Sequence, residues 1–314
     1  MTSTTARRRA LQLLTSFVAG CLVAASPAQA QTGEGSFERT LKVSGAVDLS
    51  IQTGSGQIRV QPGATDTVRI AARLTSGGSW TASNSDIEAR IRKIEQNPPI
   101  EQQGSTIRIG RFVDENLSRN ISISYDVTVP ADTKVAASTG SGSIVVGALK
   151  GEADVSSGSG SIQVEGAAAL KAHTGSGGIT ARSIAGVIAA NSGSGSITIT
   201  QTGAGEVKVS AASGGVTLTG VNGAASVSSA SGGITIDGRP SGPWSLNSSS
   251  GGVSVTVPPD AAFDLDADSS SGSVSTVHPV TMSGEIEKHH IKGKVRGGGP
   301  LVKISTSSGS IRIK

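Results

Sequence analysis

The sequence predicts an all-β protein: a β-solenoid or β-helix-like stack of two-strand repeats of about 18 residues, with one short helix in an N-terminal insertion. Three observations predict this fold. A short motif recurs at nearly constant spacing, apolar residues occupy the same places in every copy, and a segment with helical periodicity interrupts the copies near the N-terminus.

The motif Ser-Gly-x-Ile/Val occurs ten times, and from Ile144 to Val274 successive copies lie 17 to 21 residues apart. The step from Ile58 to Ile144 is 86 residues, which leaves room for an insertion, and the step from Val274 to Ile311 is 37 residues. Positions within a repeat are counted here from the branched residue, which is position 0. The position 0 residues are Ile58, Ile144, Ile162, Ile179, Ile197, Val216, Ile234, Val253, Val274 and Ile311.

The placement of apolar residues indicates two short strands in each repeat. Positions −9 and −7 are apolar in every copy, and position +2 is apolar in most copies. Because side chains alternate between the two faces of a strand, each strand presents one apolar face. Such a strand cannot bury its face alone, so the repeats should stack about 4.8 Å apart and share one core.

Every copy carries glycine at position −2 and serine at position −3, between its two strands. Glycine is expected there either because a sharp corner needs a positive φ or because two backbones approach closely. The serines are expected to line up and to hydrogen-bond along the stack. A phosphate-binding loop is the functional alternative, but its third glycine and its Gly-Lys-Ser/Thr ending are both missing.

Residues 61–134 interrupt the repeats. Good N-cap residues precede a set of isoleucines on one helical face, and Pro98 ends the segment, so a helix is expected over about Asp86–Gln96. We expect this helix to dock on the sheet or to cap its end. Strands are expected at Thr106–Ile109 and Ile121–Val129.

The C-terminal segment Pro300–Lys314 returns to the repeat register, and we expect it to close the stack. Charges on Lys303, Arg312 and Lys314 alternate with apolar residues. This alternation is a common protection of an exposed sheet edge.

Residues 1–30 have the layout of a secretory signal peptide: three arginines, an apolar stretch, and small residues before a cleavage site after Ala30. A lipid anchor on Cys21, within Val18-Ala19-Gly20-Cys21, is the less favoured alternative, because apolar residues continue past the cysteine. The expected organisation is a signal peptide over 1–30, an N-terminal β region over 31–134 with the helix at 86–96, and the repeat stack over 135–314. The stack can form one continuous domain with 36–134.

The charge balance argues against a nucleic-acid partner. The chain has 27 Lys+Arg and 23 Asp+Glu, and removal of the three arginines of residues 1–30 leaves 24 against 23. Aromatic residues make up only 2% of the chain, whereas nucleic-acid binding would need a basic face with stacking aromatics. No segment after residue 30 has 18 consecutive apolar residues, so no integral membrane span is expected.

Four features of the sequence are shared with a known family: the repeated Thr/Ser-Gly-Ser-Gly-x-Ile-x-Val, Tyr125–Thr133, Val257–Leu265 and Gly298–Ile311. In these segments the chain resembles the DUF4097 family of β-strand repeat proteins, which also carries the label "putative adhesin". The resemblance covers nearly all of residues 40–314 and implies an envelope or surface location, a non-enzymatic role and no catalytic residues.

Two clusters of ionisable residues could suggest a metal site. Glu285, Glu287, His289 and His290 lie close in sequence, and on a strand Glu285, Glu287 and His289 would share one face. Neighbours at period two need not converge on one point, so we interpret them as a solvated strand face.

Asp264, Asp266 and Asp268 alternate with apolar residues. A calcium loop would need glycine at Ser269 and glutamate at Ser275, so the three aspartates are expected to be outward-facing acids.

No catalytic, cofactor-binding or metal residue is therefore expected. His173 lies near the repeat corners, but its neighbours show no orienting carboxylate, and no Gly-x-Ser-x-Gly elbow occurs. The fourth histidine, His278, stands alone among apolar and hydroxyl residues.

We expect an exported, non-enzymatic envelope or surface protein with an adhesive or structural role, in the periplasm or associated with the cell surface or outer membrane. Its partner would be an envelope or surface protein or glycan. The alternative is a periplasmic scaffold or signalling-associated protein in an envelope-stress pathway. A polysaccharide-active β-helix enzyme is a remote alternative, because it would need clustered carboxylates and aromatic platforms.

Overall fold

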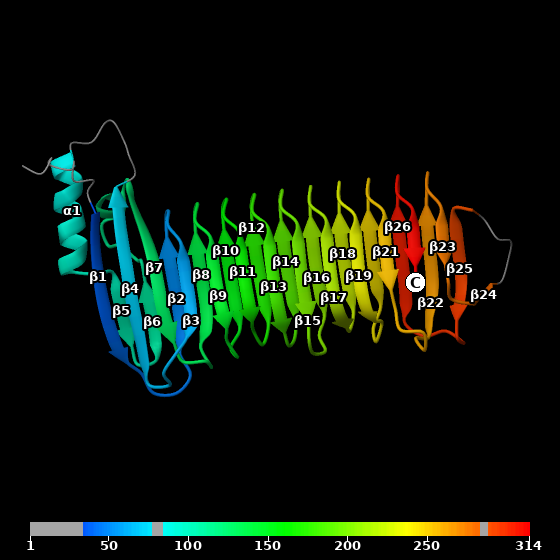
Figure 1. The fold of residues 1–314 in the computed structure, drawn as a ribbon, viewed down its shortest axis with the longest axis horizontal. Coiled ribbons are helices and arrows are strands. Elements are labelled where there is room, and N and C mark those ends of the chain that lie inside the picture. Colours follow the sequence, from blue (N-terminus) through cyan, green and yellow to red (C-terminus); the bar gives the residue numbers. More distant parts are fainter. Residues whose placement is uncertain (1–33, 77–83, 283–287) are drawn as a thin grey trace, which may run out of the picture. The chain divides into compact units, whose positions relative to one another are not determined.

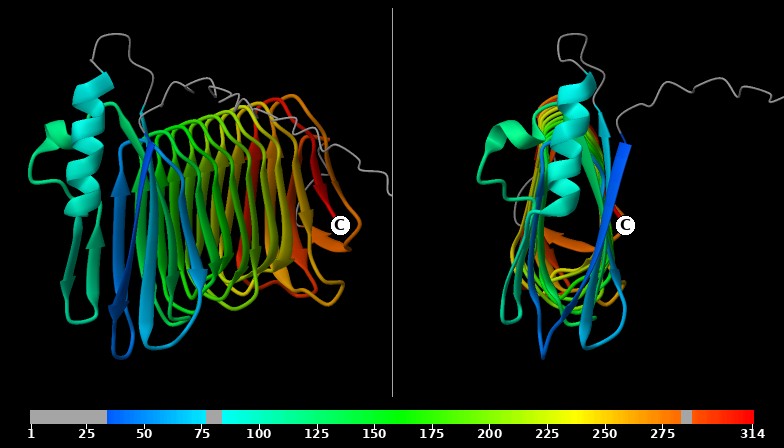
Figure 2. Two further views of the ribbon diagram at one scale, coloured as in Figure 1. Left: turned by 60° about the vertical axis from the view of Figure 1, so that its left-hand side comes forward. Right: turned by 90° about the vertical axis from the view of Figure 1, so that its left-hand side faces the viewer.

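The computed structural model describes residues 34–76, 84–282 and 288–314, and the expected signal peptide and Cys21 lie outside them. Within this part of the chain, two long β-sheets face each other along one axis (Figures 1 and 2). The predicted all-β stack is confirmed. Each rung of the stack consists of one strand from each sheet, joined at a corner.

The first sheet has 13 strands. Their spatial order is β1 (Glu34–Lys42), β4 (Thr67–Ser76), β7 (Ile121–Val129), β3 (Ile58–Pro62), β9 (Ile144–Ala148), β11 (Ile162–Gly166), β13 (Ile179–Ile184), β15 (Ile197–Gln201), β17 (Val216–Asn222), β19 (Ile234–Arg239), β21 (Val253–Thr256), β27 (Ile311–Ile313) and β23 (Val274–Thr276).

The second sheet has 14 strands. Their spatial order is β24 (Val280–Met282), β25 (His290–Val295), β22 (Phe263–Ser269), β26 (Leu301–Thr306), β20 (Trp244–Ser248), β18 (Ala225–Ser229), β16 (Val207–Ala211), β14 (Ile188–Ser192), β12 (Leu170–Thr174), β10 (Ala153–Ser157), β8 (Lys134–Thr139), β2 (Asp48–Thr53), β6 (Thr106–Ile109) and β5 (Ile100–Gln103).

The core lies between the sheets and follows the predicted register. Neighbouring rungs pair in parallel with like positions opposite each other, as in Ile162 beside Ile144 on one side and Ile179 on the other. Nine of the ten position 0 residues are at most 1% exposed, and the tenth, Val274, lies half-buried in the last strand of the first sheet. Alternation of apolar and polar residues therefore gives both strands of each repeat one buried face.

The helix α1 (Asn84–Gln96) confirms the expected helical segment and begins two residues earlier than predicted. Ile87, Ile91 and Ile94 are buried. The helix packs against β1, the outermost strand of the first sheet, and the Ser36 N–H donates to Glu95 Oε1 at 2.7 Å. The helix thus lies at the N-terminal end of the stack, while β6 and β7 have the bounds predicted for them.

The expectation that the C-terminal repeat closes the stack is wrong. β26 lies between β20 and β22, and β27 lies between β21 and β23. β24 and β25 form a hairpin, and β25 pairs antiparallel with one edge of β22. Only the opposite edge of β22 is therefore available to β26. Lys303 and Arg312 therefore lie on interior strands and protect no sheet edge.

No helix among the described residues is long and apolar enough to cross a membrane.

Candidate functional site

The corner glycines are required by close approach between rungs. A Cβ atom added to Gly195 would lie 2.0 Å from the carbonyl oxygen of Gly177, its equivalent on the preceding rung. Of the ten position −2 glycines, only Gly56 has a positive φ, at 127°. Of the two explanations that the sequence allowed, close approach of backbones therefore holds at all ten corners, and a positive φ is found in addition only at the first.

A buried row of hydroxyl groups holds the corners together. In the rung of Ser157, the hydroxyl accepts from the Gly160 N–H at 2.8 Å and donates to the Gly142 carbonyl of the preceding rung at 2.9 Å. Ser192 makes the equivalent bonds to Gly195 and Gly177, both at 2.9 Å. This hydroxyl ladder consists of Thr139, Ser157, Thr174, Ser192, Ser229, Ser248, Ser269 and Thr306.

The ladder residues occupy position −5, for which no role was predicted from the sequence. Serine or threonine stands there in nine of the ten copies, so the signal was present, and Ala211 is the exception. The position −3 serines, which were expected to bond along the stack, are exposed at the corners in every copy except Ser55. The column of hydroxyls along the stack therefore exists, two residues earlier in each repeat than predicted.

Changes at two rungs of the ladder should have opposite effects. Ser192→Ala should lower the free energy of unfolding by about 1–2 kcal/mol, because it leaves a buried N–H and a buried carbonyl without this partner. Ala211→Ser should raise it by up to about 1 kcal/mol, because the new hydroxyl can bond Gly214 and Gly195. Urea unfolding of both variants would measure the two shifts. Changes of the same sign would contradict the role given to position −5.

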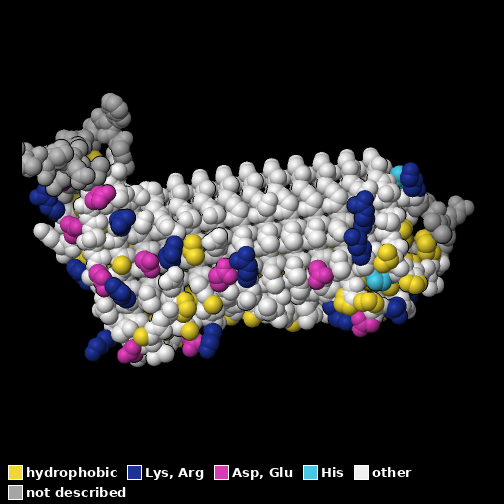
Figure 3. Space-filling model, in the orientation of Figure 1, with side chains coloured by type: hydrophobic (Ala, Val, Ile, Leu, Met, Phe, Trp, Pro, Cys, Tyr) yellow, Lys and Arg dark blue, Asp and Glu magenta, His cyan; other side chains and the backbone are white. Residues whose placement is uncertain are grey.

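Short polar side chains form columns on the outer faces of both sheets. On the first sheet Thr180, Thr198, Thr217, Thr235 and Ser254 lie in register on successive rungs. On the second sheet the corresponding column is Ser138, Ser156, His173, Asn191, Ser210, Ser228, Asn247 and Ser305. Figure 3 shows one long face, on which charged side chains are sparse over the middle of the stack.

The charges that do occur on these faces are partly paired between neighbouring rungs. Lys171 Nζ lies 3.0 Å from Asp154 Oδ2, and Arg182 lies 3.0 Å from Glu165. All four side chains are well exposed, so each pair contributes little to stability. Their effect is to leave the long faces with little net charge.

Two adjoining shallow grooves, of about 500 and 550 Å³, hollow the outer face of the second sheet. Asn191, Ser210 and Ser228 line both grooves, and Lys171 and Lys208 line the first. The Asn191 amide donates to Ser210 Oγ at 2.8 Å, so a neighbouring rung orients it. His173 also lines the first groove, where its neighbours in register are Ser156 and Asn191.

The structure does not bring the C-terminal ionisable residues into a metal site. Glu285 and Glu287 lie outside the described residues, and His289 precedes β25, with Nδ1 against the Gly272 carbonyl. His290 lies 3.2 Å from Asp266 in a partly exposed pair. Among the residues that the structure describes, no three His, Cys, Asp or Glu side chains are grouped to hold a metal ion.

The remaining ionisable candidates lie near the same end of the stack. Asp264, Asp266 and Asp268 lie on the outer side of β22, where Asp266 also faces Lys292 at 3.7 Å. His278 packs edge-on against Phe263 with ring centroids 6.2 Å apart. It therefore belongs to the packing at this end of the stack.

A cavity lies where one corner differs from all the repeat corners. The strands β6 and β7 form an extra rung beyond β2 and β3, in which Ile109 pairs with Ile51 and Tyr125 with Ile58. Ile51 and Ile58 are 7 residues apart in sequence, whereas Ile109 and Tyr125 are 16 apart, so this corner has nine extra residues. They include the short 3-10 helix η1 (Glu115–Ser118).

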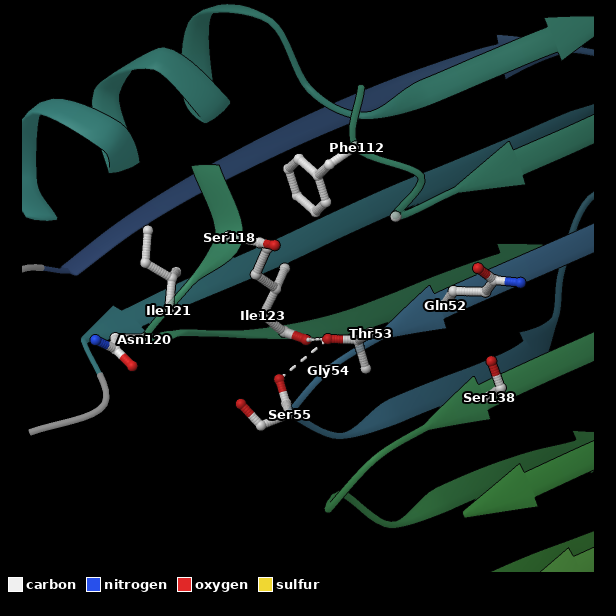
Figure 4. Close-up of a pocket in the computed structure, with 11 residues that line it drawn as sticks. Gln52, Thr53, Gly54, Ser55, Phe112, Ser118, Asn120, Ile121, Ile123 and Ser138 are labelled. Carbon is white, nitrogen blue, oxygen red and sulfur yellow. Dashed lines mark hydrogen bonds between the residues drawn. The ribbon is translucent and has the colours of Figure 1, made fainter. Parts of the chain in front are cut away.

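This corner cavity has a volume of about 450 Å³. It is lined by Gln52, Thr53, Gly54, Ser55, Gly110, Phe112, Ser118, Asn120, Ile121, Ile123 and Ser138, which are shown in Figure 4. Phe112 comes from the inserted loop, and Gln52 and Ser138 lie side by side on β2 and β8. Sequence reasoning missed the cavity, because its walls come from three segments that only the strand register brings together.

Backbone contacts hold the floor of the corner cavity in place. Thr53 stands at position −5 of the first repeat, and its Oγ1 donates to the carbonyls of Ser55 and Ile123, at 3.0 and 2.9 Å. Gly110, with φ of 87°, packs its Cα against the Gln52 carbonyl, and an added Cβ would lie 1.8 Å from that oxygen. The inserted loop therefore leaves β6 at a fixed place beside β2.

Comparison with known proteins identifies one family and several solved structures of low sequence identity. A family model described as Toastrack DUF4097 matches residues 48–314. A comparison with curated proteins found no match.

Three solved structures are among those similar to this chain. One is described as a "putative lipid binding protein" from Parabacteroides distasonis, with 13% identity and a TM-score of 0.48, covering 89% of this chain and 96% of that one. A "putative cell adhesion protein" from Clostridium sporogenes has 12% identity and a TM-score of 0.25, covering 90% and 99%. A "putative adhesin" from Bacteroides fragilis has 11% identity and a TM-score of 0.29, covering 89% and 97%.

Proposed function

The chain belongs to the Toastrack DUF4097 family, and from that premise we propose that it is an exported, non-enzymatic protein of the cell envelope or surface that binds a partner. The partner is a protein or glycan of the envelope or of a neighbouring surface, and the role is adhesive or structural.

The observation that carries this proposal is the pair of long outer faces. Columns of serine, threonine and asparagine run in register along the stack, and repeat stacks typically use such extended surfaces for binding. The faces offer many hydroxyl and amide groups and little net charge. They are suited to a partner that makes many weak polar contacts over several rungs.

A non-enzymatic role is supported by how the ionisable groups are placed. Catalysis requires an acid, a base or a nucleophile that converge on one point in a water-excluding site. Here Asp266 is shared between His290 and Lys292 on an outer face, and Lys171 and Lys208 border a shallow open groove. These groups are arranged as surface pairs.

A deletion strain of the native organism tests the proposal. Surface attachment should fall when the gene is deleted and return when the wild-type gene is restored, and fractionation should place the native protein in the envelope or on the surface. Unchanged attachment, with all of the protein in the soluble periplasm, would overturn the adhesive role and favour the periplasmic scaffold.

N-terminal sequencing and intact mass of the native protein test the export step. Cleavage after Ala30 is the expected result, and it would leave a mature chain without cysteine. A lipid-modified first residue at Cys21 would contradict this cleavage site and show an anchored protein instead.

A further inference from the structure

We propose that the corner cavity binds one neutral sugar unit of a partner glycan. This inference rests on the proposed binding role and names a class of ligand for it.

The place of the cavity in the repeat favours a site for a ligand. From Gly142 onward, each corner packs directly on the corner of the neighbouring rung, and a ladder hydroxyl lies beneath every corner except the one at Ala211. At the outermost rung the nine inserted residues open this packing into a cavity of about 450 Å³. That volume is within the range of about 300–1,000 Å³ typical of small-molecule sites. Insertions into repeats commonly form binding loops.

The lining of the cavity selects a neutral ligand. None of its eleven lining residues has an ionisable side chain, so the lining offers a charged ligand no opposite charge to offset its lost hydration. The lining instead offers the carboxamides of Gln52 and Asn120 and the hydroxyls of Ser55 and Ser138. A carboxamide both donates and accepts hydrogen bonds, as does each hydroxyl of a sugar.

The apolar part of the lining fits one face of a sugar ring. The half-buried Phe112 ring lies on the side formed by the inserted loop, and Ile121 and Ile123 continue the apolar surface (Figure 4). A pyranose has an apolar face of C–H groups and a rim of hydroxyls. Phe112 would cover the first, while Gln52, Ser55 and Ser138 would meet the second.

Asn120 is held in a conformation that few side chains tolerate. Its φ is 61°, in the left-handed region, which costs energy for most residues but less for asparagine. Residues held in this region are common at binding sites. The strain fixes the point at which the inserted loop enters β7, at the rim of the corner cavity.

Saturation-transfer NMR and calorimetric titration with glucose, galactose, mannose and N-acetylglucosamine test the inference on the full mature chain. At least one of these sugars should bind. Phe112→Ala and Gln52→Ala should each weaken binding by about tenfold, the effect of losing one good contact.

Gln96→Ala is the matched control, because it removes an exposed carboxamide from the end of α1, outside the corner cavity, and should leave sugar affinity unchanged. Thermal unfolding of every variant identifies losses that come from misfolding. The inference fails if none of the four sugars binds, or if binding survives both Phe112→Ala and Gln52→Ala. A deletion strain that loses attachment while no sugar binds would overturn the sugar site and leave the proposed function standing.

Discussion

Replacing Gly214 by alanine should destabilise the stack by about 3 kcal/mol, near the upper end of the usual range for single substitutions. The added Cβ would lie 2.1 Å from the Gly195 carbonyl oxygen and 2.5 Å from its carbon, both backbone atoms of the neighbouring rung. Neither atom can move without changing the spacing between rungs. Urea or thermal unfolding followed by circular dichroism would measure the loss.

The next residue provides a matched control. A Cβ added to Gly215 would meet its nearest atom, the Gly233 carbonyl oxygen, at 3.7 Å, which is ordinary contact, and its φ is not positive. Gly215→Ala should therefore be neutral or stabilise by up to about 1 kcal/mol, because alanine restricts the unfolded chain. Equal unfolding midpoints for the two variants would contradict the close approach at position −2.

Trp244→Ala should destabilise the protein by about 4 kcal/mol, the usual cost of removing a fully buried aromatic side chain. Trp244 is 1% exposed and occupies position −9 in β20, between Ala225 and Val302 of the neighbouring rungs. Its Nε1–H donates to the Gly223 carbonyl at 2.9 Å. Alanine would leave a cavity that the small neighbour Ala225 cannot fill. The free energy of unfolding, measured in urea, gives the size of the loss.

Trp244→Phe separates packing from hydrogen bonding. It keeps most of the ring and removes the donor to Gly223, so it should cost about 1–2 kcal/mol. If both substitutions cost the same, the hydrogen bond rather than the buried ring would account for the effect of Trp244.

The repeated part of the fold could be predicted because each strand repeats one pattern. Apolar residues at positions −9, −7, 0 and +2 define which side of a strand is buried, and a shift by one residue would expose that side. The helix was predictable for a similar reason, since Ile87, Ile91 and Ile94 share one helical face.

The order of rungs at the two ends could not be predicted. The repeat at Ile311 carries the same positions as the others, so its sequence fits equally well beside any rung. The hairpin of β24 and β25 determines where this repeat lies, because β25 occupies one edge of β22 and leaves the other edge to β26. That choice depends on contacts between distant segments, and a repeat pattern contains no information about them.

The corner cavity could not be predicted from the sequence for a similar reason. Gln52, Phe112 and Ser138 are ordinary polar and aromatic residues in three separate stretches, and no short motif joins them. Only the pairing of β6 with β2 and of β7 with β3 places them around one space. The hydroxyl ladder, in contrast, could have been predicted from position −5.

The location of the last repeat imposes an order on assembly. Strands from β10 to β19 pair only with partners about one repeat away in sequence, so they can add one by one as the chain lengthens. β22 and β23 dock on the stack only through β26 and β27, the final strands of the chain. Because proteins are made from the N-terminus, the far end stays open until β26 and β27 have been made. A chain that stops before residue 301 would keep bare edges at β20 and β21. We expect such chains to aggregate through these edges, unlike chains that contain β26 and β27.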